Sequence, residues 1–310
     1  MSAATLVATE PLVGVTAAAN TGASEPHSVD LSAPRRDRVL RALRLIAGFG
    51  ALRRDQLEDL LLGNERLTTA SRRVLAYRVI AELRDRALVE QLVVAGRAGE
   101  VVRASVLTAT GQRVYAGLDP SYPRRARPVS VVMLSHAVAL ADIAMAFREG
   151  ALHGADVSLV WESDWEAVAH MRSAAVIPDG FVTIERGGWR TRAFIEADRS
   201  TEWQRAFAEK IRRYADLYLR DEWRASISTW PLVLTVTTSP THARSLARVA
   251  HGAAVASGAA RIARAFRVTT MDELRTRGPF APIWMVGERA DRTEILAEDG
   301  TAAAPGAVGA

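Results

Sequence analysis

The sequence contains no cysteine in its 310 residues. This absence excludes disulfide bonds, thiolate metal sites and cysteine nucleophiles. It is compatible with a reducing compartment. Hydrophobic residues make up 49% of the chain and charged residues 24%, so we expect most of it to fold.

The sequence also lacks a recognisable targeting or membrane segment. Its first residues carry no basic region ahead of an apolar run and include Glu10, so they do not resemble a secretory signal. The most apolar stretch, 129–147, is interrupted by His136 and Asp142, and a buried helix explains it better than a membrane span. We therefore expect a soluble, cytoplasmic protein with a disordered leader (residues 1–34) and a disordered tail (298–310).

Lysine is almost absent as well. Lys210 is the only lysine among the 40 basic residues, and the net charge is +5. A positive balance favours a polyanionic partner. A compositional bias toward arginine explains why arginine outnumbers lysine, but it does not explain why one lysine is present. A lysine ammonium is compact and its pKa falls on burial, so Lys210 would lie at a position where a guanidinium could not replace it. The alternative is that this lysine is present by chance.

Residues 35–118 follow the order of a winged helix-turn-helix. Apolar residues recur at helical spacing in three segments, and two β-rich runs follow them. The loop between these runs contains Gly96 and Gly99, as is typical of a hairpin. The helices are expected to begin near Arg35, Arg54 and Thr68, and the strands at 88–94 and 101–107, with a short helix after them.

The third helix would enter the major groove of double-stranded DNA. Leu75, Val79 and Leu83 form its apolar stripe, and arginines and a tyrosine lie opposite. The predicted DNA-binding residues are Arg72, Arg73, Tyr77 and Arg84 on this helix and Arg97 at the hairpin tip. Two alternatives remain: the domain mediates protein contacts, or its arginines are only solvated.

The second half predicts a mixed α/β domain. A basic linker at 119–130 leads into a domain at 131–297, in which strands and helices alternate. This order is typical of a central sheet flanked by helices. Strands are expected at 157–161, 176–184, 191–197, 231–237, 266–269 and 283–286, and helices at 135–149, 201–219 and 241–257.

Three acidic residues lie at one end of the hairpin formed by 176–184 and 191–197. Strand alternation places Glu196 and Asp198 on one face, roughly 7 Å apart along the strand, and pairing can bring Asp179 beside them. Three converging carboxylates repel one another unless a cation lies between them. Oxygen ligands suit Mg²⁺ or Mn²⁺, which support phosphodiester hydrolysis. We therefore expect Asp179 and Glu196 to bind metal and Asp198 to join them in catalysis.

The solitary lysine lies on the apolar side of the helix at 201–219. Lys210 falls within the arc formed by Trp203, Phe207, Ile211, Tyr214, Leu217 and Tyr218. A buried ammonium needs a carboxylate partner. Lys210 would therefore form a structural ion pair with Glu196 or Asp198, or it would act in catalysis by stabilising a developing charge or orienting water.

These residues resemble two known groups. Asp179 and Glu196 on a hairpin resemble the PD-(D/E)xK nuclease core, in which an aspartate and a glutamate bind the metal and a lysine assists. The stretches Leu134-Ser135-His136, Ile177-Pro178-Asp179 and 195–202, continued to Lys210 and Tyr214, resemble the replication-relaxation family of plasmids and integrative elements from Gram-positive bacteria. The resemblance implies a restriction-endonuclease-like sheet behind a winged helix, a DNA role in mobile-element replication or transfer, and replication or conjugation proteins as partners.

The sequence departs from the nuclease pattern at one position. Asp198 stands where lysine usually follows the glutamate, so Lys210 would have to supply that charge. The nuclease likeness also implies a further acidic ligand, which could be Asp142, Glu149 or Glu162. His136 is expected to start a helix or to pack.

Two hypotheses follow. The leading one is a DNA-binding protein of a mobile element with metal-dependent nicking or cleavage. The alternative is a DNA-binding regulator whose nuclease-like domain is inactive and serves homodimerisation or partner binding. A relaxase forming a phosphotyrosine link has little support, because no histidine cluster accompanies Tyr214 or Tyr218.

Overall fold

The structure is a computed structural model that describes residues 33–63, 65–95, 101–123, 131–154, 157–171, 176–199 and 204–296. The predicted tail, Arg97 and most of the predicted leader and linker lie outside these residues. None of the helices in this described part is both long and apolar enough to cross a membrane.

The first half consists of three helices followed by a hairpin. The third helix begins where the sequence predicts, because the Thr68 hydroxyl accepts a hydrogen bond from the Ser71 amide (3.1 Å). A short strand that the sequence did not predict pairs with the hairpin and gives the sheet order β1-β3-β2. The elements are α1 (Ala33–Phe49), β1 (Leu52–Arg53), α2 (Arg54–Leu62), α3 (Thr69–Asp85), β2 (Val89–Ala95), β3 (Val101–Leu107) and α4 (Ala109–Leu118).

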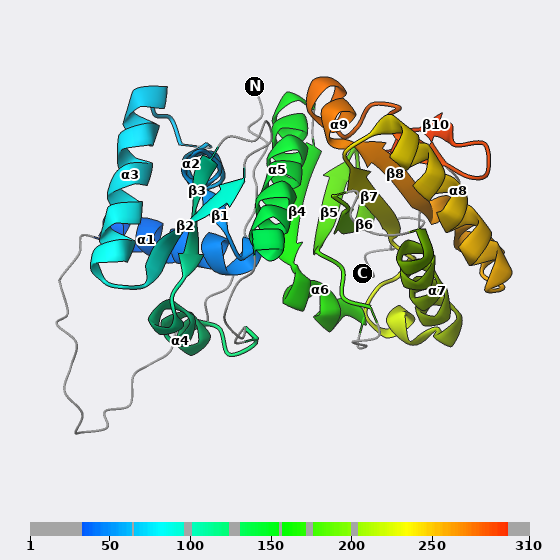
Figure 1. Ribbon diagram of the computed structural model, residues 1–310, viewed down its shortest axis with the longest axis horizontal. Helices are drawn as coiled ribbons and strands as arrows, with labels where there is room; N and C mark the ends of the chain where they lie inside the picture. Colours follow the sequence, from blue (N-terminus) through cyan, green and yellow to red (C-terminus); the bar gives the residue numbers. More distant parts are fainter. Residues whose placement is uncertain are drawn as a thin grey trace, which may run out of the picture.

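The second half is built on a seven-stranded sheet of order β10-β9-β8-β7-β6-β5-β4 (Figure 1). Strands β4, β5 and β6 form an antiparallel meander, whereas β6, β7 and β8 run parallel. The strands are β4 (Val157–Ser163), β5 (Gly180–Arg186), β6 (Trp189–Ala197), β7 (Leu232–Thr237), β8 (Phe266–Thr270), β9 (Trp284–Val286) and β10 (Asp291–Thr293). The mixed α/β class expected from the sequence is thus confirmed.

Helices cover both faces of this sheet. On one face, Phe207 and Tyr214 of α7 and Leu246 of α8 pack with Phe181 and Phe194 of the sheet. On the other face, α5 and α9 pack in a separate core cluster. The helices are α5 (Val131–His153), α6 (Asp164–Met171), α7 (Gln204–Arg220), η1 (Glu222–Ala225), α8 (Pro240–Ala256), η2 (Ala260–Ala265) and α9 (Met271–Arg277). The sequence did not predict α6, α9, η1, η2 or β10, and α5 begins earlier than expected.

Helix α5 joins the two halves (Figure 1). One core cluster contains Ile46 and Leu57 from the first half together with Phe147 of α5 and Ile195 and Trp284 of the sheet. The apolar interior is therefore continuous from α1 to β9.

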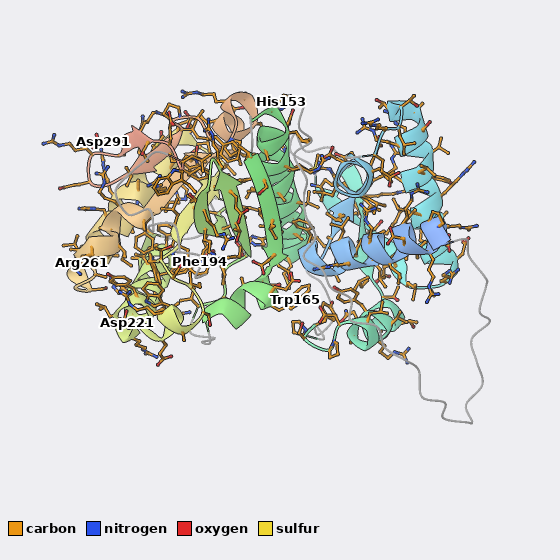
Figure 2. The ribbon with its side chains drawn as sticks, turned by 180° about the vertical axis from the view of Figure 1, so that it is seen from behind. His153, Trp165, Phe194, Asp221, Arg261 and Asp291 are labelled. Carbon is orange, nitrogen blue, oxygen red and sulfur yellow. The ribbon has the colours of Figure 1, made fainter. Side chains whose placement is uncertain are left out.

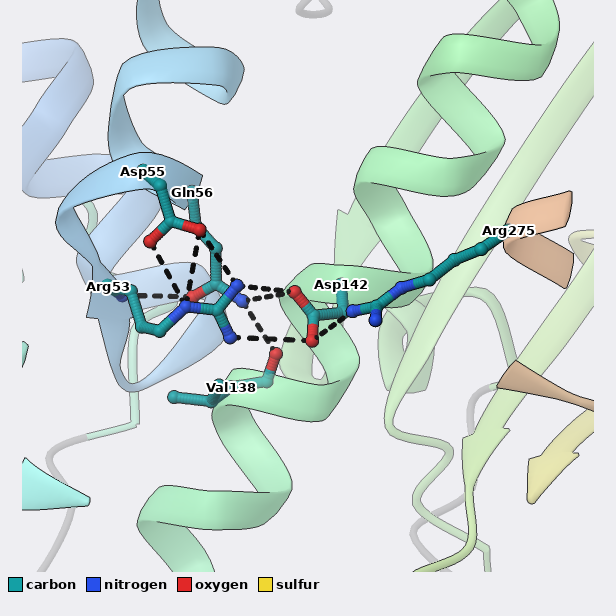
Figure 3. Close-up of polar contacts among 6 residues, drawn as sticks. All are labelled: Arg53, Asp55, Gln56, Val138, Asp142 and Arg275. Atoms are coloured by element: carbon teal, nitrogen blue, oxygen red, sulfur yellow. Dashed lines mark hydrogen bonds and ion pairs between the residues drawn. The ribbon is translucent and has the colours of Figure 1, made fainter. Parts of the chain in front are cut away.

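A polar network centred on Asp142 reinforces this junction (Figure 3). Asp142 Oδ1 accepts hydrogen bonds from Arg53 Nη2 (2.9 Å) and Gln56 Nε2 (2.8 Å), and Arg275 Nη2 lies 2.6 Å from Oδ2. Gln56 also donates to the Val138 carbonyl oxygen (2.8 Å). Asp142, weighed above as a metal ligand, is instead paired with two guanidinium groups from the two halves, as a largely buried carboxylate requires.

Candidate functional site

A tight turn sets the register that brings the first two acids together. Gly187 and Gly188 have φ of +55° and +83°, the left-handed conformation that a two-residue hairpin turn requires. The resulting ladder pairs Gly180 with Ile195. Its next step places Asp179 opposite Glu196, and the Asp179 amide donates to the Ile195 carbonyl oxygen (3.0 Å).

Glu196 is buried against α7, with only 2% of its surface exposed. Lys210 Nζ donates to its Oε2 atom (2.9 Å), and the Tyr214 hydroxyl donates to Oε1 (2.6 Å). Lys210 and Tyr214 are four residues apart on α7, so both reach the same carboxylate. Burial raises the pKa of Glu196 to about 7, and the charge of Asp179 adds to this effect, against the opposing influence of Lys210 and Tyr214.

Asp179 is held by a backbone amide and a histidine. Its Oδ2 atom accepts a hydrogen bond from the Ala197 amide (2.7 Å), and Oδ1 lies 3.0 Å from His136 Nε2. The hydrogen bond to Asp179 raises the pKa of His136, although burial opposes the shift. His136 was expected only to start a helix or to pack. It lies within α5 and pairs with an acid, and no sequence pattern indicated that pairing. We call His136, Asp179, Glu196, Lys210 and Tyr214 the Glu196 cluster.

Asp198 makes its described contacts away from the Glu196 cluster. Its Oδ2 atom accepts a hydrogen bond from Thr237 Oγ1 (2.6 Å) and lies 2.9 Å from His242 Nε2. This approach does not meet the geometry of a hydrogen bond, and His242 Nε2 has no hydrogen-bond partner among the described residues. The side chain of Asp198 is only 3% exposed. The parallel pairing of β6 with β7 brings Thr237 to Asp198, and no pattern in the sequence indicated Thr237 or His242 as partners.

The acidic residues of this site were expected to bind a divalent cation. Among the residues that the structure describes, no group of three or more acidic or histidine side chains is placed to hold a metal ion. Two carboxylates meet, but Lys210 and His136 already face them. A divalent cation bound by these two carboxylates would have to displace Lys210 and His136. The side chains as arranged can hold and exchange protons, and Lys210, with 31% of its side chain exposed, presents positive charge near the surface.

The predicted DNA-binding residues that the structure describes lie on one helix. Arg73, Tyr77 and Arg84 are exposed, Tyr77 by 64%. At 100° per residue these three side chains lie within about 40° of one another around α3. Arg72 is half-buried on the side that faces the core, and its Nε atom has no hydrogen-bond partner in the described chain.

Residues 43–233 match the family described as replication-relaxation, and this span is well over half of the chain. The chain belongs to the replication-relaxation family. Membership suggests a role in the replication or transfer of a plasmid or mobile element. The matched span contains α3 and the whole Glu196 cluster but ends within β7, before His242 and α8. Neither a curated protein nor a solved structure matches the sequence.

Proposed function

We propose that this replication-relaxation protein binds double-stranded DNA of a plasmid or integrative element and acts in its replication or transfer. The main support for DNA binding is the exposed stripe of Arg73, Tyr77 and Arg84 on α3. The stripe belongs to three helices followed by a hairpin whose strand β3 also pairs with β1. This arrangement supports a winged helix-turn-helix, in which α3 would lie in the major groove and the hairpin beside the phosphates.

Binding of a labelled duplex to the full chain tests this proposal. Arg73→Gln with Arg84→Gln is expected to weaken binding at least about tenfold, because each arginine supplies a phosphate or base contact. Arg212→Gln with Arg213→Gln removes the same charge from α7 and is expected to leave the affinity within about twofold. Unchanged binding by the α3 double variant would show that the groove contact lies elsewhere.

For the second half we propose a nuclease-like domain that serves as a scaffold for homodimerisation or for a replication or conjugation partner. The meander β4-β5-β6 followed by α7 and the parallel strand β7 supports the likeness to the PD-(D/E)xK core. The pairing of its acids with Lys210, Tyr214 and His136 favours a structural role for them.

Metal-dependent DNA cleavage is the second candidate for this domain. It is favoured by Asp179 and Glu196 lying opposite each other with Lys210 at hydrogen-bond distance from Glu196. Incubation of supercoiled plasmid with the full chain and Mg²⁺ or Mn²⁺ separates the two candidates. The scaffold proposal expects no nicking above that of the Asp179→Ala variant. Nicking that disappears in Asp179→Ala, Glu196→Ala and Lys210→Ala would replace the scaffold proposal by the enzymatic one.

A further inference from the structure

A long segment of the second half carries positive charge without any acid. Residues 223–271 contain six arginines and neither aspartate nor glutamate. This segment forms β7, α8, η2 and β8. In a chain whose basic and acidic residues number 40 and 35, such separation concentrates positive potential on the elements that the segment builds.

Four of these arginines are exposed on α8 and on η2, which packs against it. They are Arg244, Arg248, Arg261 and Arg264, and we call them the α8 arginine surface. None of the four forms an ion pair with any residue of the described chain. Arg244 Nη2 donates a long hydrogen bond to the hydroxyl of Thr241 (3.5 Å).

The outer face of α8 suits close approach by a partner. Five of its exposed residues, Thr241, Arg244, Arg248, Gly252 and Val255, lie within about 80° around the helix axis at 100° per residue. A side chain added at Gly252 would meet nothing within 4 Å. The helix face that carries Arg244 and Arg248 is therefore open at Gly252.

The neighbouring helix α7 differs from α8 in carrying acids beside its arginines. On α7, Arg212 pairs with Glu209 (3.0 Å), and Arg213 lies 4.0 Å from the same carboxylate. Asp216 adds a further exposed acid to that helix. Both helices thus carry exposed arginines, but α8 contains no acid, whereas α7 contains Glu209 and Asp216.

We infer that the α8 arginine surface is a second contact for DNA, which binds the sugar-phosphate backbone without reading sequence. Arginine is well matched to phosphate in charge and in hydrogen-bond geometry. A surface without acids imposes no repulsion on a polyanion. The choice of DNA as the polyanion rests on the proposed function, whereas the surface itself lies outside the span that matches the family.

The α8 arginine surface lies close to the buried Asp198 but far from α3. His242, which lies against Asp198, is in the first turn of α8, between Thr241 and Arg244. Helices α3 and α8 lie at opposite ends of the molecule in Figure 1, and Figure 2 places Arg261 at the end away from α3. The two contacts are therefore separate, and they take either two DNA segments or one segment that extends along the molecule.

Salt-dependent binding of a labelled duplex to the full chain tests the inference. Arg244→Gln with Arg248→Gln is compared with Arg212→Gln with Arg213→Gln, because each pair removes two positive charges from an exposed helix face. The α8 pair is expected to lower affinity about tenfold and to reduce the slope of log K against log salt by about 2, since each lost phosphate contact reduces it by about 0.9. The α7 pair is expected to change neither quantity. Unchanged thermal unfolding of both variants serves as the folding control.

The outcomes distinguish this inference from the proposal for α3. Normal binding by the α8 pair, or an equal loss in the α8 and α7 pairs, would overturn the α8 surface. If the α8 pair weakens binding while Arg73→Gln with Arg84→Gln does not, the α8 surface stands and the groove contact on α3 falls. The reverse result removes the α8 surface and leaves the proposed function intact.

Discussion

At Glu196 the cost of burying a carboxylate is opposed by its hydrogen bonds. Its carboxylate is buried, and both of its oxygens accept hydrogen bonds from α7. Without these donors the ionised form would be strongly unfavourable in such a position. Burial nevertheless raises its pKa from 4.5 to about 7. Between these two pH values the native protein keeps a proton on Glu196 that the unfolded chain has already released.

This proton makes stability depend on pH with a definite sign. Between pH 4.5 and about 7 the native state binds more protons at Glu196 than the unfolded state, so the free energy of unfolding falls as pH rises. The raised pKa of His136 acts in the same direction above pH 6.5. We expect urea unfolding to show wild type losing on the order of 3 kcal/mol relative to Glu196→Gln between pH 5 and pH 8.

A matched acid on the same hairpin provides the control. Glu185 is an exposed residue of β5 paired with Arg190, and Glu185→Gln is expected to follow the wild-type pH profile. A constant difference between wild type and Glu196→Gln across this range would mean that Glu196 titrates normally.

The contact between Lys210 and Glu196 gives a second prediction at this scale. Lys210→Met removes the ammonium but keeps an apolar stem, and it is expected to reduce the free energy of unfolding at pH 8 by about 1–3 kcal/mol. Adding Glu196→Gln should recover part of this loss, because no buried charge is then left unpaired. Arg213→Met on the exposed side of α7 is the control and should be nearly neutral. Strictly additive losses would show that the two side chains do not stabilise each other.

At the scale of elements, backbone conformation decides what a glycine contributes. Gly188 has a positive φ in the β5–β6 turn, whereas Gly252 lies within α8 with open space around it. The turn sets the register that pairs Asp179 with Glu196. Gly252 does not determine any strand register. Its main effect is to increase the conformational entropy of the unfolded chain.

The same substitution should therefore have opposite effects at these two positions. Gly188→Ala is expected to lower the free energy of unfolding by about 1–2 kcal/mol, because an alanine in the left-handed conformation is strained. Gly252→Ala is expected to raise it by about 0.5–1 kcal/mol. Thermal unfolding of the two variants measures both values. A stabilising Gly188→Ala would mean that the turn does not adopt this conformation.

Elements with strong local signals were predicted well. α3 has a capping threonine and a regular apolar stripe, and β5 and β6 flank a glycine turn, so their residues specify them locally. The short elements β1, β10 and α9 were missed, because two to seven residues carry too little periodicity to be recognised. They exist because neighbouring strands and helices complete their hydrogen bonds and bury their apolar side chains.

At the scale of the whole molecule, the two halves share one interior. The core cluster around Phe147 continues from α1 and α2 into the sheet, and ion pairs cross the junction, including Arg148 with Asp59 (2.9 Å) and Arg53 with Asp142 (2.9 Å). A continuous core favours unfolding as one cooperative unit.

The tryptophans allow this to be tested directly. All 7 tryptophans follow residue 160, and Trp161 and Trp165 pack against Phe49 and Tyr122 of the first half. Tryptophan fluorescence therefore reports the second half and its junction with the first, whereas far-ultraviolet circular dichroism reports the backbone of both halves. We expect the two signals to give the same unfolding midpoint. Asp142→Ala should lower that shared midpoint, because Arg53 and Arg275 lose their common partner. Separate midpoints in the wild-type protein would show that the halves unfold independently.

The sequence by itself determined the elements with strong local patterns, the mixed α/β class, and the presence of two acids and a lone lysine near one end of a hairpin. Hairpin register is a local property, so the pairing of Asp179 with Glu196 could be expected. The tertiary structure alone decided that Asp198 lies with Thr237 and His242, that His136 pairs with Asp179, and that Asp142 joins the two halves. These contacts link segments far apart in the chain, and their partners depend on parallel strand pairing and helix packing, for which a single sequence carries no local signal.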